Sequence, residues 1–148
     1  MKTIGYIIAL AGVTALSACK NAEMKNKSQQ QVVYPQAVLV ENPDTYAESA
    51  DFSMMAVSIE GNVISITVEY SGGCEKHNWE LVGSESIQKS LPPKRGMRLI
   101  HHNNGDSCRS IVEENLKFDI SALAYEGGEI ILNLQGWVTP LSYTKANQ

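Results

Sequence analysis

The segment from residue 62 to residue 70 alternates between apolar and polar side chains, and this pattern constrains the fold more than any other. The apolar positions are Ile64, Ile66, Val68 and Tyr70, and the polar positions between them are Ser65, Thr67 and Glu69. A period of two places successive side chains on opposite faces of a strand. The segment is therefore predicted to be a β-strand with one face in the core.

Other short runs that are rich in β-branched residues, leucine or aromatic residues predict further strands. These runs are residues 37–40, 52–59, 78–82, 97–102, 116–120 and 129–137. Glycine and proline clusters separate them, and the turn at residues 60–62 predicts a hairpin. A turn or two of helix is expected at most near residues 110–115, and residues 89–98 are interpreted as an exposed loop. The pattern is typical of an all-β fold, either an antiparallel β-sandwich or a small barrel.

The N-terminus has the features of an export signal. Lys2 precedes an uncharged, mainly apolar run at residues 4–16, which is shorter than the about 20 residues of a transmembrane helix. The run ends in Leu16-Ser17-Ala18-Cys19, a motif that resembles the lipobox of bacterial lipoproteins. We therefore expect residues 1–18 to be removed as a signal peptide and Cys19 to carry lipid, including palmitate. The alternatives are an ordinary secretory signal and a buried N-terminal helix.

The residues after the signal divide into a tether and a domain. Residues 20–31 are mostly polar and bury too little apolar surface to offset their conformational entropy. Residues 19–35 are therefore predicted to be a lipidated cysteine with a flexible tether, and residues 36–148 a single β-rich domain. Lys20 follows the cysteine, which favours the outer membrane of a Gram-negative bacterium, facing the periplasm or the cell surface. The lipid makes the membrane one partner, whereas the net charge of −4 argues against nucleic acid.

Cys74 and Cys108 are predicted to form one disulfide. Disulfides persist in oxidising, extracytoplasmic compartments. Each cysteine lies beside a glycine-containing turn, which helps two loops to approach closely. The bond closes a loop of about 35 residues, for which the chain-entropy estimate is roughly 3–4 kcal/mol of stabilisation.

The histidines suggest an alternative, which is a metal site. His77, His101 and His102 all lie between the two cysteines, with Asp106 close to the second cysteine. Cysteine and histidine are ligands of zinc and copper, and Asp106 could add an oxygen. A site built from His77, His101 and Asp106 therefore stays open, although the spacing matches no common zinc module. If the histidines are structural instead, no metal or other cofactor is expected.

The favoured interpretation is that the histidines have structural roles beside the disulfide. Strand alternation places His101 and His102 on opposite faces of the sheet. We predict that His77 and His101 are partly buried and hydrogen-bonded near the disulfide, and that His102 is more exposed. Asp106 is expected to cap the turn at residues 103–105.

Residues 70–81, followed by residues 101–108 and 118–123, resemble a group of small uncharacterised lipoproteins from Bacteroidetes and other Gram-negative bacteria. In that group a Gly-Gly-Cys-x-x-His motif, here residues 72–77, is paired with a later His and Asp-x-Cys motif, here within residues 101–108. The likeness extends over residues 62–143. It implies a β-rich domain with a cysteine pair on the cell envelope, and it transfers no catalytic residue.

The sequence contains no recognised catalytic motif. Ser71 or Ser107 could be combined with His77 or His101 and Asp106, but no Gly-x-Ser-x-Gly elbow, His-Glu-x-x-His motif or phosphate loop supports such a set. The chain is therefore interpreted as an envelope lipoprotein that is a non-catalytic binding or interaction module and not an enzyme. Metal handling is the second interpretation and hydrolysis the third, and the sequence does not indicate which protein or small molecule is bound.

Overall fold

Residues 32–147 are the part of the chain that the computed structural model describes, and they form eight strands and two short 3-10 helices. The signal peptide, Cys19 and most of the predicted tether lie outside the described residues. In chain order the elements are β1 (Val38–Val40), η1 (Pro43–Thr45), β2 (Ser53–Glu60), β3 (Val63–Gly72), β4 (Asn78–Ser84), β5 (Lys94–His102), β6 (Ser110–Asp119), η2 (Ser121–Leu123), β7 (Ile130–Leu134) and β8 (Leu141–Tyr143). In this part of the chain no helix has the length and apolar character needed to cross a membrane.

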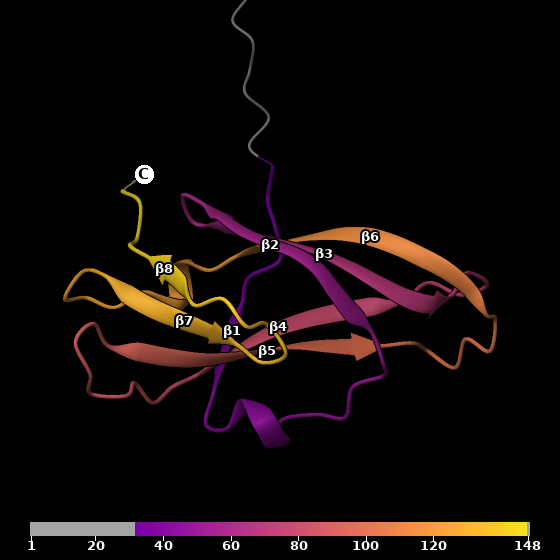
Figure 1. Ribbon diagram of the computed structural model, residues 1–148, viewed down its shortest axis with the longest axis horizontal. Helices are drawn as coiled ribbons and strands as arrows, with labels where there is room; N and C mark the ends of the chain where they lie inside the picture. Colours follow the sequence, from indigo (N-terminus) through magenta and orange to yellow (C-terminus); the bar gives the residue numbers. More distant parts are fainter. Residues whose placement is uncertain (1–31, 148) are drawn as a thin grey trace, which may run out of the picture. The chain divides into compact units, whose positions relative to one another are not determined.

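The strands form two sheets that enclose one hydrophobic core. One sheet has five strands in the order β1-β4-β5-β7-β8, and the other has three in the order β2-β3-β6. Figure 1 shows the three-stranded sheet lying over strands of the five-stranded sheet. Buried side chains from both sheets, such as Ile66 of β3 and Leu132 of β7, belong to the same core cluster. The predicted all-β fold is confirmed, and it is a β-sandwich.

Strand β3 is the centre of the smaller sheet and contains the segment with the strictest alternation. Ile64, Ile66 and Val68 are fully buried, while β2 and β6 pair with β3 on either side in antiparallel directions. Gly61 in the β2–β3 turn has a φ of +58°, a conformation that glycine adopts without steric cost. The predicted hairpin at residues 60–62 is therefore confirmed.

Two strand pairings are parallel, whereas the sequence analysis expects antiparallel strands throughout. Strand β1 pairs with β4 in parallel, and β5 pairs with β7 in parallel. Between β5 and β7 the chain enters the other sheet as β6 and then returns, and a long crossover of this kind permits a parallel pair. Side-chain alternation shows which face of a strand is buried, but it carries no information on the direction of its neighbour.

Three local expectations differ from the structure. Residues 110–115 begin strand β6 and are not helical, because they pair one by one with residues of β3. Residues 94–98 belong to β5 and not to an exposed loop, and Arg95 is buried. Strand β8 is not predicted, yet it pairs with β7 and its Tyr143 is buried. In each case, pairing with another strand determines the local conformation.

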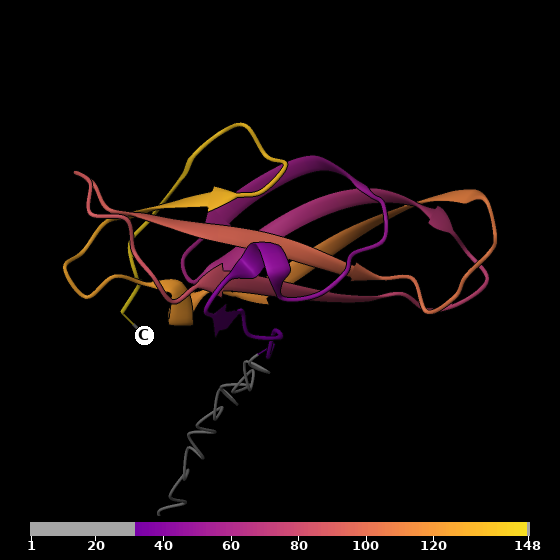
Figure 2. The same ribbon diagram turned by 90° about the horizontal axis from the view of Figure 1, so that it is seen from below.

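The two ends of the β4–β5 pair differ in chemistry. Asn78 lies opposite His102 at one end, and Gly83 lies opposite Met97 toward the other. Figures 1 and 2 show the connections at residues 85–93 and 103–109 at opposite ends of β5. The histidines and the proline-containing loop are therefore separated by the length of this strand.

Candidate functional site

Two connections meet at the histidine end of the sandwich. The connection from β3 to β4 carries Cys74 and His77, and the connection from β5 to β6 carries Asp106 and Cys108. The Cys74–Cys108 disulfide joins them with a Cα–Cα distance of 5.9 Å. The predicted disulfide is confirmed, and it holds together two loops that each run from one sheet to the other.

Asp106 is the residue that organises this end. Its Oδ2 atom accepts hydrogen bonds from the backbone N–H groups of Cys74 and Glu75, both at 3.0 Å, and its Oδ1 atom accepts one from the N–H of Cys108 at 2.8 Å. These donors stabilise the carboxylate, so the pKa of Asp106 lies far below its usual range, with the Glu75 N–H as the largest cause. Asp106 thus fastens both disulfide-linked loops by their backbones.

This arrangement corrects the predicted role of Asp106. The side chain that caps the turn at residues 103–105 belongs to Asn103, whose Oδ1 accepts a hydrogen bond from the N–H of Gly105 at 3.3 Å. Asp106 contributes only its backbone N–H there, which donates to the carbonyl of Asn103 at 2.9 Å. An Asx turn closes locally, and the Asp106 carboxylate is left to bind the distant segment at Cys74.

His77 and His101 lie against each other behind Asp106. They are only 5 % and 2 % exposed, and His77 Nδ1 is 2.7 Å from His101 Nε2. The other nitrogen of His77 is 3.2 Å from Asp106 Oδ2, and the other nitrogen of His101 is 3.2 Å from the carbonyl of Asp51. The three side chains therefore form a linear chain of contacts that ends on the backbone.

Aromatic side chains enclose the histidine pair. The Trp79 ring stacks on the His101 ring with centroids 4.0 Å apart and an interplanar angle of 5°, and the Tyr70 ring contacts both histidines. Tyr70 Oη and Trp79 Nε1 both donate to Glu114 Oε2, at 3.2 and 3.3 Å. Burial in this enclosure lowers the pKa of His101, since desolvation penalises the charged ring.

Counting protons shows a constraint on the pair. Two neutral imidazoles carry two ring protons, but the chain from Asp106 through His77 and His101 to the carbonyl of Asp51 contains three contacts. Every contact contains a hydrogen only when the two rings together hold one extra proton, with Asp106 as the counter-charge. A neutral pair therefore leaves one of the three contacts without a hydrogen.

The linear arrangement of Asp106, His77 and His101 also bears on the two alternatives from the sequence, which are a metal site and a hydrolase. The ring of His77 stands between His101 and Asp106, so these three residues do not direct one ligand atom each at a common point, as a zinc site needs. Among the described residues, neither Ser71 nor Ser107 hydrogen-bonds to a histidine, as a serine nucleophile does with its base. The contacts of the cluster connect the loops that follow β3 and β5 with strand β5 and with the backbone at Asp51.

His102 lies on the other face of β5, as strand alternation predicts. Its side chain is partly exposed, and its Nε2 is 3.0 Å from Glu80 Oε1 on the adjacent strand. His102 is therefore separate from the buried pair, although it is adjacent to His101 in sequence.

The depressed pKa of Asp106 leads to a prediction for acid stability. Because the folded pKa lies below the unfolded value, the stability that the carboxylate contributes is fully present above about pH 4 and is lost progressively as the pH falls further. Asp106→Asn should be less stable than the wild type at pH 7, and this difference should narrow at pH 3. Denaturant unfolding at both pH values measures it, with Asp44→Asn, at an exposed carboxylate, as the baseline. A difference that stays constant would contradict the assignment.

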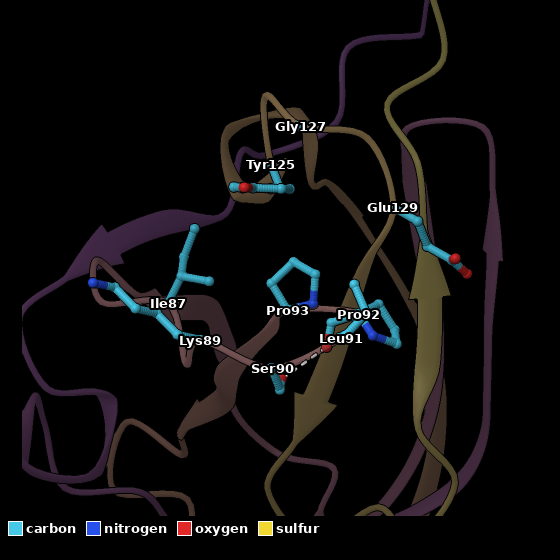
Figure 3. A pocket seen from close by; sticks show the side chains of 9 residues that line it. All are labelled: Ile87, Lys89, Ser90, Leu91, Pro92, Pro93, Tyr125, Gly127 and Glu129. Atoms are coloured by element: carbon cyan, nitrogen blue, oxygen red, sulfur yellow. Dashed lines mark hydrogen bonds between the residues drawn. The ribbon is translucent and has the colours of Figure 1, made fainter.

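An open groove of about 990 Å³ lies at the opposite end of the sandwich (Figure 3). Its lining consists of Ile87, Lys89, Ser90, Leu91, Pro92, Pro93, Tyr125, Gly127 and Glu129. In Figure 3 the side chains of Ile87, Pro93 and Tyr125 lie around the hollow, whereas the carboxylate of Glu129 points away from them. Leu91 is 100 % exposed. Exposed apolar side chains gathered at one place are a surface that a partner can bury.

Backbone hydrogen bonds hold the first wall of the groove. The N–H of Gln88 donates to the carbonyl of Lys94 at 2.8 Å, and the N–H of Lys94 donates back at 3.2 Å. The carbonyl of Pro93 accepts a hydrogen bond from the N–H of Ile131 in β7 at 2.9 Å. The loop that presents Leu91 is thus fixed at both its base and its side.

The second wall is the turn at residues 125–128, which the N–H of Gly128 closes by donating to the carbonyl of Tyr125 at 3.1 Å. A Cβ atom at position 127 would overlap the Tyr125 ring. Glycine at this position therefore allows the ring to lie over the turn and to face the groove.

The sequence analysis did not identify this groove. The interpretation of residues 89–98 as an exposed loop describes Leu91 correctly but misses its neighbours, because Tyr125 and Glu129 come from a connection more than 30 residues later. The available signal was the Leu91-Pro92-Pro93 run itself, an apolar segment at a turn where polar residues are the rule.

The fold and these two ends define a small, disulfide-linked β-sandwich with a closed polar cluster and an open apolar groove. No protein-family model matches the chain, and no curated protein matches it. Among solved structures, a NigD-like immunity protein from Bacteroides caccae is similar, with a TM-score of 0.53 and 14% sequence identity over 77% of this chain and 60% of that chain. A protein from Parabacteroides distasonis that is described as related to a toxin has a TM-score of 0.50 and 16% identity over 74% of this chain and 61% of that chain.

At these identities the likeness shows a shared fold. This chain spans about three fifths of the length of the two similar structures. The β-sandwich is therefore a core that those proteins share with this one.

Proposed function

We propose that the protein is a lipid-anchored, extracytoplasmic binding module without catalytic activity, and that its groove receives an apolar segment of a protein partner. The observation that carries the proposal is the fully exposed Leu91 beside the preformed hollow lined by Pro93 and Tyr125. Burying one leucine side chain contributes about 1.5–3 kcal/mol, so this residue is a suitable anchor for a protein contact.

The arrangement of the histidines supports a non-catalytic role. A catalytic base needs a free nitrogen within reach of a substrate, but each ring nitrogen of His77 and His101 already faces a protein atom. Both rings are also buried behind Trp79 and Tyr70.

Within this class, an immunity-type activity is the specific proposal. The NigD-like protein that shares the fold is described as an immunity protein, and the second similar protein as related to a toxin. An immunity protein on the envelope has to bind one protein partner and needs no chemistry of its own. The groove of this chain supplies such a binding surface.

Anchoring is the first part of the proposal to test. The Leu16-Ser17-Ala18-Cys19 motif predicts that the mature protein starts at Cys19 and carries acyl chains, which together hold it stably on a membrane. Mass spectrometry of the mature N-terminus should find acylated Cys19, and Cys19→Ser should accumulate as the uncleaved precursor. An unacylated N-terminus at another residue would contradict the lipoprotein assignment.

Partner binding is tested by photo-crosslinking in intact cells. A photo-reactive amino acid at position 91 should yield one defined crosslinked protein, whereas the same amino acid at Val138, which is 95 % exposed outside the groove, should not. Tyr125→Ala should reduce the crosslink at position 91. Equal products at positions 91 and 138 would show that the groove is not the binding surface.

Cell survival then separates an immunity role from binding of another kind. Cells that lack the protein should become sensitive to a secreted protein toxin of related cells, and the wild-type protein should restore resistance. Leu91→Asp should fail to restore it, because a charged residue at the centre of an apolar contact must be desolvated. Full resistance with Leu91→Asp would exclude the groove from this activity.

A further inference from the structure

At the disulfide end of the sandwich, the two cysteines and Asp106 form a second group of potential ligands, apart from the histidine pair. Within residues 32–147, the ligand atoms of Cys74, Cys108 and Asp106 lie within 4.8 Å of one another. Cys74 is exposed, so a small dithiol can reach the disulfide from solvent. The side chain of Asp106, by contrast, has no exposed surface.

The carboxylate of Asp106 retains one free acceptor position. Its Oδ2 atom receives the N–H groups of Cys74 and Glu75 and the ring nitrogen of His77. Its Oδ1 atom receives only the N–H of Cys108. Because a carboxylate oxygen offers two lone pairs, Oδ1 can bind one further partner, and a carboxylate oxygen of Asp106 lies within 4.8 Å of both sulfurs.

We propose that reduction of the Cys74–Cys108 disulfide converts this end into a zinc site, with the two thiolates and Asp106 Oδ1 as ligands and a water molecule in the fourth position. Zinc prefers four ligands in a tetrahedral arrangement, and thiolate, imidazole and carboxylate are the protein groups that it binds. The disulfide-linked form cannot bind zinc in this way, because neither sulfur is then a thiolate.

The electrons and protons for reduction of the disulfide come from a dithiol. The dithiol gives two electrons and two protons to the Cys74–Cys108 bond and is itself oxidised to a disulfide, which leaves two thiols on the protein. Zinc binding then displaces the two thiol protons into solvent. Once zinc is removed, a small disulfide that accepts two electrons and two protons from the thiols restores the Cys74–Cys108 bond and is itself reduced to two thiols.

The hydrogen bonds of Asp106 keep the ligands together after reduction. Asp106 binds the backbone N–H groups of both cysteines, so the two loops remain connected when the sulfur bond is opened. His77 contacts Oδ2 and is itself in contact with His101, an outer-shell support that orients a ligating carboxylate in many metal sites. In this proposal the buried histidine pair holds the Asp106 carboxylate in position and does not itself bind the zinc.

The test uses the mature chain, reduced with dithiothreitol, freed of reductant without oxygen and then exposed to zinc and dialysed. Elemental analysis should find close to one zinc per reduced chain and background zinc in the oxidised chain. Cobalt in place of zinc should give a thiolate charge-transfer band. Cys74→Ser and Asp106→Asn should weaken zinc binding by more than the about 10- to 100-fold that is typical of outer-shell changes.

Glu75→Gln is the matched control, because it removes a neighbouring exposed carboxylate and should leave zinc binding unchanged. Equal zinc in the oxidised chain, or wild-type binding by Asp106→Asn, would overturn the proposal. If the reduced chain unfolds by circular dichroism, zinc should restore its β-sheet spectrum, and a chain that stays unfolded with zinc would also overturn it. The proposal is independent of the groove, because none of these residues lines it.

Discussion

The variant Cys74→Ala/Cys108→Ala is expected to lose about 2–5 kcal/mol of free energy of unfolding. The disulfide joins residues 34 apart in sequence, and its removal lets the unfolded chain explore many more conformations. A domain of this size has about 5–15 kcal/mol of total stability, so the loss is a large fraction of it. Denaturant unfolding of the oxidised wild type and the double variant measures the difference.

Reduction of the wild type provides the control for that experiment. The reduced, metal-free protein should match the double variant within about 1 kcal/mol, because both lack the bond and differ little in volume at the two positions. A double variant as stable as the oxidised wild type would show that the Asp106 hydrogen bonds alone constrain the loops.

His101→Ala is expected to destabilise the fold by about 2–4 kcal/mol. The substitution leaves a cavity against Trp79, and it removes the partner of His77 Nδ1, whose side chain is buried. His101→Phe should recover part of the loss, because it restores a stacked ring but no hydrogen bond. The same denaturant experiment measures both variants.

His102→Ala is the matched control, since His102 is the next residue in the sequence but lies partly exposed on the other face of β5. It should change stability by no more than about 0.5 kcal/mol. Equal effects at positions 101 and 102 would contradict the buried chain of contacts. Unchanged stability of His101→Ala together with loss of bound metal would instead favour the alternative in which histidines bind a metal.

The two ends of the sandwich differ in chemistry and can be tested separately. At the histidine end, polar groups face one another and the two histidines are buried against the rings of Tyr70 and Trp79. At the groove end, apolar groups face solvent around Leu91. Binding through the groove and chemistry at the disulfide can therefore be perturbed by separate substitutions, which makes the experiments at the two ends independent.

The success of the sequence analysis for β2, β3 and β4 has a local cause. Alternation along residues 62–70 requires an extended backbone with one buried face, whatever the partner strand is. The cysteine pair is similarly readable, because two cysteines in an oxidised domain have one partner each. The opposite orientations of His101 and His102 also follow from the strand period alone.

Features that depend on distant segments could not be predicted from local sequence patterns. The parallel partner of β5 and the strand at residues 110–115 are each set by hydrogen bonds to strands far away in the sequence. The two walls of the groove likewise come from separate connections. A pattern within a few residues contains no record of such neighbours.

Asp106 shows the difference between what the sequence determines and what only the tertiary structure decides. The sequence by itself determined that a carboxylate stands two residues before a cysteine, near a turn and near histidines, and that the strands around it form a disulfide-linked β fold. Only the tertiary structure decided that this carboxylate binds the N–H groups of Cys74 and Glu75 and contacts His77. The physical reason is that these partners lie about 30 residues away in sequence and reach Asp106 only when strands β4 and β5 pair and align their ends.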